Sequence, residues 1–414
     1  MLLNAEIEDN VDHKGETPTK TAPVSQAVLN KYQADKQALL DLDDQCGYAC
    51  EELSYKEKIA ENKLDKLRQE MFEEDLLLVN KPYYENYKKI QNSALYRAFL
   101  ELPKPGVHHT HLTACADLDF LLKLTYNTFV FYSEKDDKFI VNKKLKDNEK
   151  PGYLKVNTLR QYAANADEFD RKLKENILLK VAEPEDHVIW AQFQPKFNLT
   201  FELYNYFPFF ERILHKVSKG YLKEYGTILE YRHIFGCLFD DDGPVSIDRE
   251  IECFYKVEAA LKHMYPLMRI KIIVCGLKLL GREHIQAMLD SIVERKHECY
   301  KMIAGFDMVN EEDYWSPIDT FLDQILEARE KVGHDKFQVY LHAGESTSRN
   351  NKELYDAVLL GSKRIGHGFA LARHPSLIQL VKERDICLEA CPVSNFVLGY
   401  QRDLRCHPIR GLIA

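Results

Sequence analysis

Four histidines and one glutamate are the residues of this sequence whose types and spacing suit metal chemistry. His109 and His111 stand two residues apart in GVHHTHL. His342 and Glu345 stand three apart in VYLHAGES, and His367 closes the short segment RIGHG. Alternate residues of a β-strand point to the same face, so the first two imidazoles are expected to lie together while His108 points away.

Three neutral imidazoles form a natural zinc site in which water completes the coordination shell. A bound zinc ion lowers the pKa of that water enough to supply hydroxide at neutral pH. We therefore expect Zn²⁺ at the histidines, with Glu345 beside it as a proton carrier. The small residues between His342 and Glu345 would let the chain turn and deliver the carboxylate to the same pocket.

Each of these motifs is weak by itself. An HxH pair usually consists of two ordinary surface histidines, and a histidine on an apolar strand is more often a hydrogen-bonded core residue than a ligand. The combination of HxH, HAGE and GHG, each closing a candidate strand, is far more specific. Other catalytic patterns are missing from the sequence: it has no GxSxG elbow, no phosphate-binding loop and no CxxC pair.

Short apolar strands that alternate with amphipathic helices must position these residues. The candidate strands are GVHHTHL, GTILEYRHIF, MRIKIIVCGL, MIAGFDMV, KFQVYLHA, KRIGHG and DICLEACPV. The helix-like stretches between them include 251–264, 282–300, 318–332 and 352–360. Such alternation indicates a parallel α/β sheet. Seven repeats over roughly 300 residues fit a (β/α)8 TIM barrel, whose active site lies at the C-terminal ends of the strands. No glycine-rich loop follows the first strand, which weakens an open dinucleotide-binding sheet as the alternative.

The distribution of polar, apolar and charged residues along the sequence predicts three regions. Residues 1–24 are polar and are expected to be a disordered tail. Residues 25–95 read as an amphipathic helical extension whose apolar stripe must pack on the main domain or on a second subunit. Residues 96–414 are expected to form the barrel, and a highly charged stretch of about 121–185 reads as an insertion near its active-site face.

Charge and hydropathy exclude two classes of partner. The formal net charge is −9 and no basic run stands out, so nucleic acid is not an expected partner. No apolar run approaches the ~20 residues of a membrane span. The first thirty residues lack the apolar core of a signal peptide, which by itself favours a cytoplasmic location.

The motifs HTH, AGFDMV, LHAGE, RIGHG and CPVSN occur in the order found in the adenosine deaminase family, and the sequence resembles that family. It looks most similar to the secreted branch of adenosine deaminase-related growth factors. That likeness lies in LSYKEKIAENKLDKLRQEM, KPYYENYKKIQNSALYRAFLELPK, DEFDRKL and DLRCHPI. The resemblance extends from about residue 25 to Ala414.

The resemblance implies a zinc-dependent hydrolase of the barrel type that converts adenosine or 2'-deoxyadenosine to the inosine analogue and ammonia. It implies His109, His111 and His342 as the zinc ligands. It also implies an extracellular protein that forms a homodimer through its N-terminal helices.

The same resemblance implies roles for the remaining site residues. Glu345 would protonate the purine ring and make the adjacent carbon electrophilic. His367 would handle the proton of the zinc-bound water. Trp190, in WAQFQPKF, would help to cover the substrate, which is expected to be a small purine nucleoside.

Three substrate contacts depart from the family pattern. An aspartate that contacts the ribose is replaced within HLT, at Leu112 and Thr113. A histidine of the third strand is replaced by Leu277. A glycine that offers its N–H to the purine is replaced by Asn310, a residue type that tolerates positive φ. These changes keep two alternatives open: deamination of a related amino-purine such as AMP, and a catalytically degenerate, growth-factor-like binding protein.

The end of the sequence is a further departure. The eighth strand of the family carries two adjacent aspartates, one a metal ligand and one a catalytic residue that binds the base. This sequence stops at HPIRGLIA, before that strand. We therefore expect a barrel without its eighth strand, from an incomplete gene model or a fragment.

Overall fold

The structure is a computed structural model that describes residues 25–44, 52–75, 78, 81, 83–104, 106–179, 189–224, 226–295 and 301–413. The expected tail of residues 1–24 lies outside the described residues. The chain divides into two compact units, Met1–Ser54 with Ile413–Ala414, and Tyr55–Leu412. The expected helical extension of residues 25–95 is therefore shared between the units.

The first unit contains helix α1 (Gln26–Asp44), which exposes several large apolar side chains. These are Val28, Leu29, Tyr32, Leu39 and Leu40. A homodimer built through the N-terminal helices stays a prediction.

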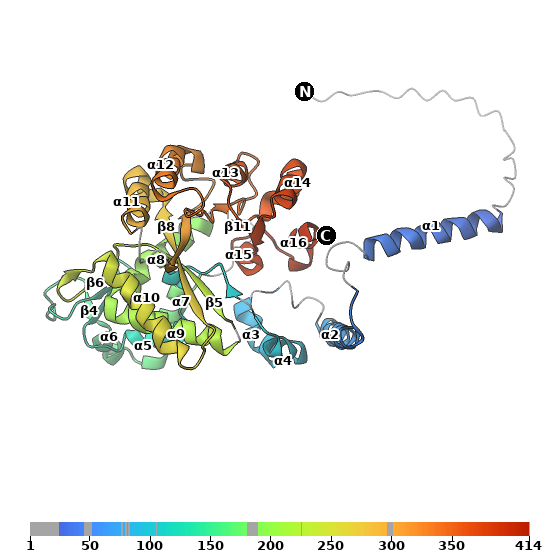
Figure 1. Ribbon diagram of the computed structural model, residues 1–414. Helices are drawn as coiled ribbons and strands as arrows, with labels where there is room; N and C mark the ends of the chain where they lie inside the picture. Colours follow the sequence, from blue (N-terminus) through green and yellow to red (C-terminus); the bar gives the residue numbers. More distant parts are fainter. Residues whose placement is uncertain are drawn as a thin grey trace, which may run out of the picture. The chain divides into compact units, whose positions relative to one another are not determined.

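The second unit begins with helices and continues as strands that alternate with helices (Figure 1). The leading helices are α2 (Tyr55–Glu74), α3 (Tyr83–Asn92) and α4 (Ala94–Glu101). The parallel strands are β1 (Gly106–Val107), β5 (Ile228–His233), β8 (Arg269–Leu277), β9 (Ile303–Val309), β10 (His342–Ala343), β11 (Arg364–His367) and β12 (Cys387–Glu389). The helices around and after these strands are α8 (Ile189–Asn205), α9 (Phe207–Lys223), α10 (Ile247–Lys262), α11 (Gly281–Glu294), α12 (Leu322–Val332), α13 (Glu353–Leu359), α14 (Pro375–Glu383), α15 (Pro392–Val397) and α16 (Ile409–Ile413).

The parallel strands follow one another in the order of the sequence. One sheet has the order β1-β5-β8-β9 and another β10-β11-β12, and a parallel bridge from Phe306 to Val339 joins them. Parallel neighbours connected by helices are what the alternating pattern predicted. Among the described residues, β1 and β12 are not hydrogen bonded to each other, so the structure shows seven strand positions of a barrel and no closed barrel.

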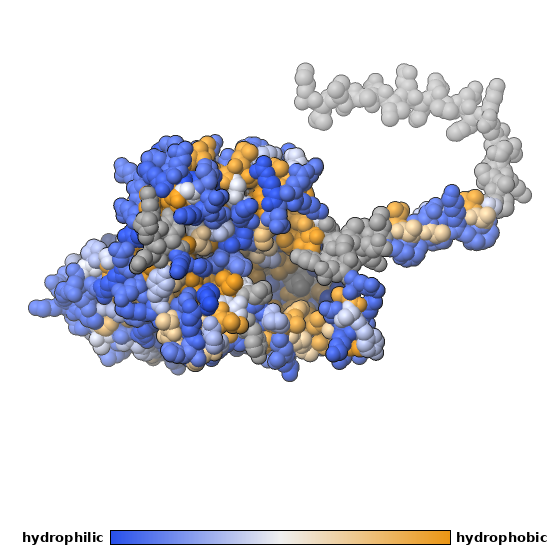
Figure 2. All heavy atoms as spheres, viewed as in Figure 1, coloured by the Kyte–Doolittle hydropathy of each residue, from blue (hydrophilic) through white to orange (hydrophobic). Residues whose placement is uncertain are grey.

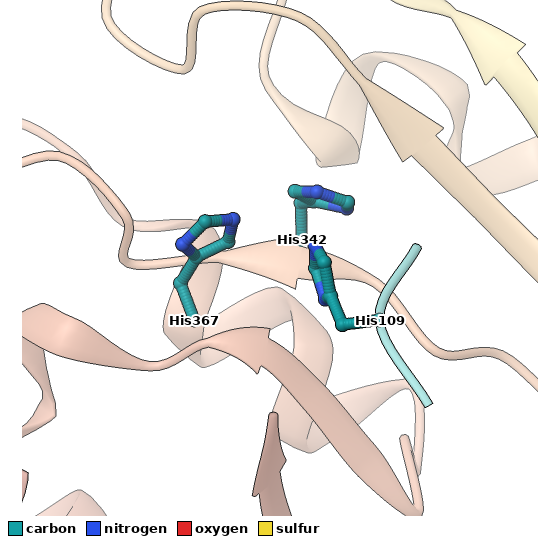
Figure 3. A group of neighbouring side chains, drawn as sticks. All are labelled: His109, His342 and His367. Atoms are coloured by element: carbon teal, nitrogen blue, oxygen red, sulfur yellow. The ribbon is translucent and has the colours of Figure 1, made fainter. Parts of the chain in front are cut away.

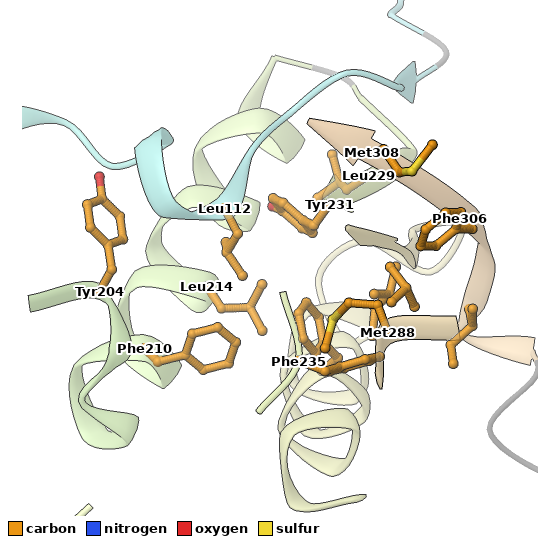
Figure 4. Close-up of a cluster of buried hydrophobic side chains, with 14 of the residues drawn as sticks. Leu112, Tyr204, Phe210, Leu214, Leu229, Tyr231, Phe235, Met288, Phe306 and Met308 are labelled. Atoms are coloured by element: carbon orange, nitrogen blue, oxygen red, sulfur yellow. The ribbon is translucent and has the colours of Figure 1, made fainter. Parts of the chain in front are cut away.

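Strand β5 shows how the sheet separates an apolar layer from a charged one. Leu229 and Tyr231 enter the hydrophobic core (Figure 4), while Glu230 and Arg232 point to the opposite face. This is the two-residue alternation of a strand. Arg232 Nη2 lies 2.7 Å from a carboxylate oxygen of Glu389, although their strands are second and seventh in the order. The sheet therefore curves as a barrel does, with charged side chains inside it.

The charged stretch expected as an insertion folds as a small subdomain. It contains an antiparallel sheet of β2 (Val130–Ser133), β3 (Lys138–Val141) and β4 (Leu154–Lys155), in the order β3-β2-β4. Helices α5 (Leu118–Leu124), α6 (Val156–Tyr162) and α7 (Ala166–Ile177) accompany it. A two-stranded ribbon follows β5 and is formed by β6 (Phe239–Asp240) and β7 (Gly243–Pro244).

Hydrophilic residues cover most of the face drawn in Figure 2, with apolar residues between them. Within the described part of the chain, no helix has both the length and the apolar character that crossing a membrane requires.

Candidate active site

The first pair of histidines follows a very short strand. β1 ends at Val107, yet the chain stays alongside β5, because the Arg232 N–H donates to Thr110 O at 2.8 Å and His111 forms a parallel bridge with Arg232. His109 and His111 both line one cavity, as their spacing predicted. His108 does not line it, and its Nδ1 lies 3.2 Å from a Glu230 carboxylate oxygen instead.

The second pair comes from neighbouring strands. His342 lies in β10 and His367 ends β11, and Ala343 pairs in register with His367. Gly366 permits the close approach of these segments, because a Cβ there would lie 3.2 Å from the His109 ring. His367 adopts a φ of 65°, in the left-handed region where backbone strain often accompanies function.

The rings of His109, His342 and His367 converge (Figure 3). The His109 ring centroid lies 4.6 Å from that of His342, 4.9 Å from that of His367 and 5.3 Å from that of His111. One ligand atom from each of His109, His342 and His367 lies within 4.8 Å of the others, and His111 Nε2 lies 3.2 Å from His342 Nε2. The structure thus gathers the four histidines that the sequence singled out.

Two buried carboxylates fix the tautomers of this cluster. His109 Nδ1 donates to Glu389 at 2.9 Å, and His342 Nδ1 donates to Asp307 at 2.7 Å. Metal-binding histidines characteristically donate their second nitrogen to such a group, which leaves the other nitrogen as the ligand. The donor set fits a zinc ion, because two imidazoles have Nε2 free and a third brings its Nε2 beside them.

One guanidinium joins these two carboxylates. Arg232, which is fully buried, pairs through Nε with Asp307 at 2.6 Å and through Nη2 with Glu389 at 2.7 Å. Burial alone would raise the pKa of Glu389, but the hydrogen bond from His109 and the Arg232 charge hold that pKa well below its usual range. Glu389 is therefore ionised, and His109 stays oriented by a charged partner.

Burial also keeps the imidazoles neutral. It lowers the pKa of His109, and it holds the pKa values of His111, His342 and His367 well below the ordinary histidine value. The neighbouring imidazoles add to the effect at the last three. Neutral imidazole is the form that binds metal or accepts a proton. The buried Nδ1 of His367 has no hydrogen-bond partner among the described residues.

Glu345 reaches the same place through a tight turn. Gly344 has a φ of 68°, and a Cβ there would lie 2.7 Å from Leu354 atoms, so glycine is required for the turn. Glu345 Oε1 lies 3.4 Å from His367 Nε2. Burial, followed by the charge of Glu312, raises the pKa of Glu345 to about 8. Glu345 is therefore largely protonated at neutral pH and able to donate a proton.

A cavity of about 560 Å³ lies over these groups, and its wall is mainly apolar. The residues that line it include Trp190, Phe193, Phe197, Phe201, Ile234, Leu277, Leu279, Leu280, Val309 and Asn310. Trp190 lies in the first turn of α8, and its Nε1 donates to Tyr400 OH at 3.0 Å.

The structure distinguishes the two residues at the expected ribose contact. Leu112 does not face the cavity; it is buried in the hydrophobic core, and Thr113 lines the cavity instead. Thr113 thus lies on the same side as His109 and His111, and a 3₁₀ turn covers Leu112–Ala114. Asn310 has a φ of 118°, as expected for a residue at a glycine position, and its Oδ1 accepts the Leu279 N–H at 3.2 Å.

Sequence reasoning missed the residues that support the cluster: Arg232, Asp307 and Glu389. Each was present in a predicted strand, in EYRHIF, GFDMV and CLEACPV. A single charged residue inside an apolar strand is a usable signal, because charged groups are rarely buried unless they are paired. Their partners could not be named without the curvature of the sheet.

Comparisons with known proteins find relatives in sequence and in fold. A model of the adenosine deaminase family matches residues 248–414. Adenosine deaminase of Aedes albopictus is 28% identical over 370 residues, covering 84% of this chain and 67% of the relative. Adenosine deaminase 2-A of Danio rerio is 27% identical, covering 87% and 75%. Adenosine deaminase 2 of Dictyostelium discoideum is 29% identical, covering 76% and 60%, so each match spans only part of the relative.

Solved structures agree in fold. The N6-mAMP deaminase of arabidopsis has a TM-score of 0.52 at 18% identity, covering 76% of this chain and 80% of that one. Adenine deaminase of Arthrobacter aurescens has a TM-score of 0.51 at 15% identity, covering 75% and 79%. The chain is thus similar in sequence to the adenosine deaminase family, by the family match over residues 248–414 and by its relatives, and the solved structures agree with it in fold alone.

Proposed function

We propose that the protein is a zinc-dependent deaminase that hydrolyses adenosine and 2'-deoxyadenosine to inosine and 2'-deoxyinosine with release of ammonia. The observation that carries the proposal is the convergence of four histidines and the buried carboxyl group of Glu345 on the floor of one mainly apolar cavity. Sequence relatives called adenosine deaminase support it.

In this proposal, His109, His111 and His342 hold the zinc ion. When bound, zinc supplies a Lewis acid that makes water nucleophilic at neutral pH. Asp307 and Glu389 keep two of these imidazoles in the tautomer that leaves Nε2 free, and the fixed rings need no rearrangement during the reaction.

Glu345 is the general acid. Its pKa of about 8 keeps the proton on the carboxyl group until substrate binds. Transfer of this proton to a ring nitrogen of the purine makes the adjacent carbon electrophilic. A general acid works best when its pKa lies near the working pH, and burial of Glu345 provides that match.

His367 is the base for the attacking water. Burial keeps its imidazole neutral, so it can accept a proton, and its Nε2 lies 3.4 Å from the Glu345 carboxyl group. The base and the acid therefore stand side by side on the cavity floor. The proton that His367 accepts then passes to the purine amino group, whose C–N bond breaks to release ammonia, and the proton of the new hydroxyl group returns to the Glu345 carboxylate.

The cavity wall favours a neutral nucleoside over AMP. Arg232 is the one lysine or arginine among the described residues that line it, and its guanidinium is fully buried between Asp307 and Glu389. No cation of the described wall is thus available to a phosphate. The apolar residues suit a purine ring, and Thr113 and Asn310 offer neutral polar contacts to a sugar or base.

The test is a comparison of substrates with the zinc-loaded chain. Release of ammonia is measured from adenosine, 2'-deoxyadenosine and AMP at equal concentrations, with Glu345→Gln as the control for contaminating deaminase. We expect turnover of both nucleosides and at least tenfold weaker turnover of AMP. Clear preference for AMP contradicts the substrate assignment. Bound zinc without any deamination favours the growth-factor-like binding protein.

The remaining parts of the proposal concern assembly and location. A homodimer formed through residues 25–95 would give α1 a partner for its exposed apolar side chains. The mass of the protein in solution, measured by light scattering, tests this part. An extracellular location, suggested by the resemblance to the growth-factor branch, is tested by following the protein in the medium of cells that express it.

A further inference from the structure

The turn that carries Glu345 is held by a second buried carboxylate, Glu312. This residue follows β9 and is 7% exposed. Its Oε1 accepts the backbone N–H of Glu345 at 3.1 Å, and its Oε2 accepts the backbone N–H of Ser346 at 3.2 Å. One carboxylate therefore binds two successive amides of the turn, one with each oxygen.

Glu312 is one of several groups that hold the turn: the Ala370 N–H donates to Gly344 O at 2.8 Å, and Ser346 Oγ donates to Asp313 at 2.6 Å. Strand β10 consists of His342 and Ala343 and ends before the turn begins. Among the described residues, the polar contacts of the Glu345 side chain are long, 3.5 Å to Ser394 Oγ and 3.4 Å to His367 Nε2. The position of its carboxyl group therefore depends on its backbone, and Glu312 is the group that binds the Glu345 amide.

Glu312 is itself held from the far side of the cavity wall. Asn351 Nδ2 donates to its Oε2, and Asn351 Oδ1 accepts the Glu353 N–H at 2.9 Å. Glu353 in turn forms a buried ion pair with Lys278 Nζ at 2.7 Å. Lys278 follows strand β8. The chain of contacts thus runs from two other strand ends of the barrel to the turn that bears Glu345.

We propose that Glu312 is a positioning residue, which holds the acid Glu345 at the distance that proton transfer to the substrate requires. Glu312 does not line the cavity and belongs to none of the groups that could hold the metal. The inference rests on the proposed function, because it assigns Glu312 a role in the same reaction. It adds a residue that acts only through the turn.

The adjacent Glu311 provides a matched control. Glu312→Gln keeps the shape of the side chain but replaces one acceptor oxygen by a donor, so one turn amide loses its partner. We expect kcat to fall about 100-fold, the effect of a roughly 1 Å displacement, while KM changes less than threefold. Zinc content is expected to stay at the wild-type level. Glu311→Gln should leave all three quantities unchanged.

A second measurement does not depend on turnover. Hydrogen–deuterium exchange of a peptide covering residues 340–350 reports directly on the amides of Glu345 and Ser346. We expect these amides to be protected in the wild type and in Glu311→Gln, and to exchange at least tenfold faster in Glu312→Gln. If Glu312→Gln does not fold, Asn351→Ala, which removes a donor to the same carboxylate, should change exchange and kcat in the same direction by a smaller factor.

Each outcome decides between the alternatives. Unchanged kcat and unchanged exchange in Glu312→Gln overturn the proposal. A fall in kcat that follows zinc loss or a lower folded fraction also overturns it, because Glu312 would then be merely structural. If the wild type deaminates no purine nucleoside, the proposed function fails, while exchange still shows whether Glu312 anchors the turn.

Discussion

The floor and the wall of the cavity differ in polarity. The floor holds neutral histidines that are oriented by buried carboxylates, with Arg232 between Asp307 and Glu389. The wall is mainly apolar, and its described residues present no free cation. In the proposed function, the floor moves protons and holds the metal ion, and the wall selects an uncharged ligand.

This difference separates chemistry from recognition. Buried ionic groups tolerate few changes, because removal of one partner leaves another charge unpaired. Apolar wall residues tolerate exchanges of similar volume. The three departures at expected substrate contacts fall on the wall, at Thr113, Leu277 and Asn310, while the histidines and Glu345 keep the positions that the resemblance implies. Substitutions on the two surfaces should have effects of different kind and size.

The largest effect is expected at the acid of the floor. Glu345→Gln keeps the size of the side chain but cannot donate a carboxyl proton, so turnover of adenosine should fall about 10³-fold. Bound zinc, measured by elemental analysis, should stay at the wild-type level. Activity within tenfold of the wild type would remove Glu345 from the role of acid.

The next effect concerns the support of the floor. Asp307→Asn removes the charge that orients His342 and one of the two carboxylate charges that pair with Arg232. Zinc affinity should therefore fall about 10- to 100-fold. Leu277→Met is the control on the wall, where zinc affinity should not change. Both are measured by competition with a chelator of known affinity. Equal affinities in the two variants would mean that Asp307 does not support the metal site.

The pH dependence follows from the raised pKa of Glu345. Its folded-state value of about 8 lies above the ordinary value, so the proton needed for catalysis is present below pH 8 and is lost as the pH rises through it. Above that point kcat/KM should fall about tenfold per pH unit. Zinc content should stay constant over the same range. An alkaline limb that begins well below pH 7 contradicts this assignment.

The smallest effect is expected at an exposed residue of the cavity wall. Leu280 lines the cavity and is 53% exposed, so Leu280→Arg can add a cation without disturbing the core. The ratio of kcat/KM for AMP to that for adenosine should rise about three- to fivefold, as for an exposed ion pair. Leu280→Gln is the neutral control. If this ratio rises equally in Leu280→Gln, the altered preference results from the shape of the side chain and not from its charge.

The sequence predicted much of this architecture. The strands around His109, His342 and His367 were predicted because each is a short apolar run that ends in a polar residue, and the structure places their histidines together. The regular strands are shorter than the apolar runs that predicted them: β1 is Gly106–Val107 and β10 is His342–Ala343. Periodicity marks buried residues, but the end of hydrogen-bonded pairing depends on the neighbouring strands.

Two features could not be derived in this way. The pairing of Arg232 with Glu389 depends on the curvature of the sheet, which one-dimensional patterns do not specify. The contact of Glu312 with the turn at Glu345 likewise joins segments 33 residues apart through backbone amides, which leave no mark on residue type.

The measurement that tests the central claim most directly is adenosine turnover and zinc content determined together on one sample. The protein is assayed as purified, after removal of metal by a chelator, and after zinc is returned. The account predicts that ammonia release falls with the loss of zinc and recovers in proportion to the zinc restored. Turnover that persists without metal, or a fully zinc-loaded protein that deaminates no purine nucleoside, would contradict it.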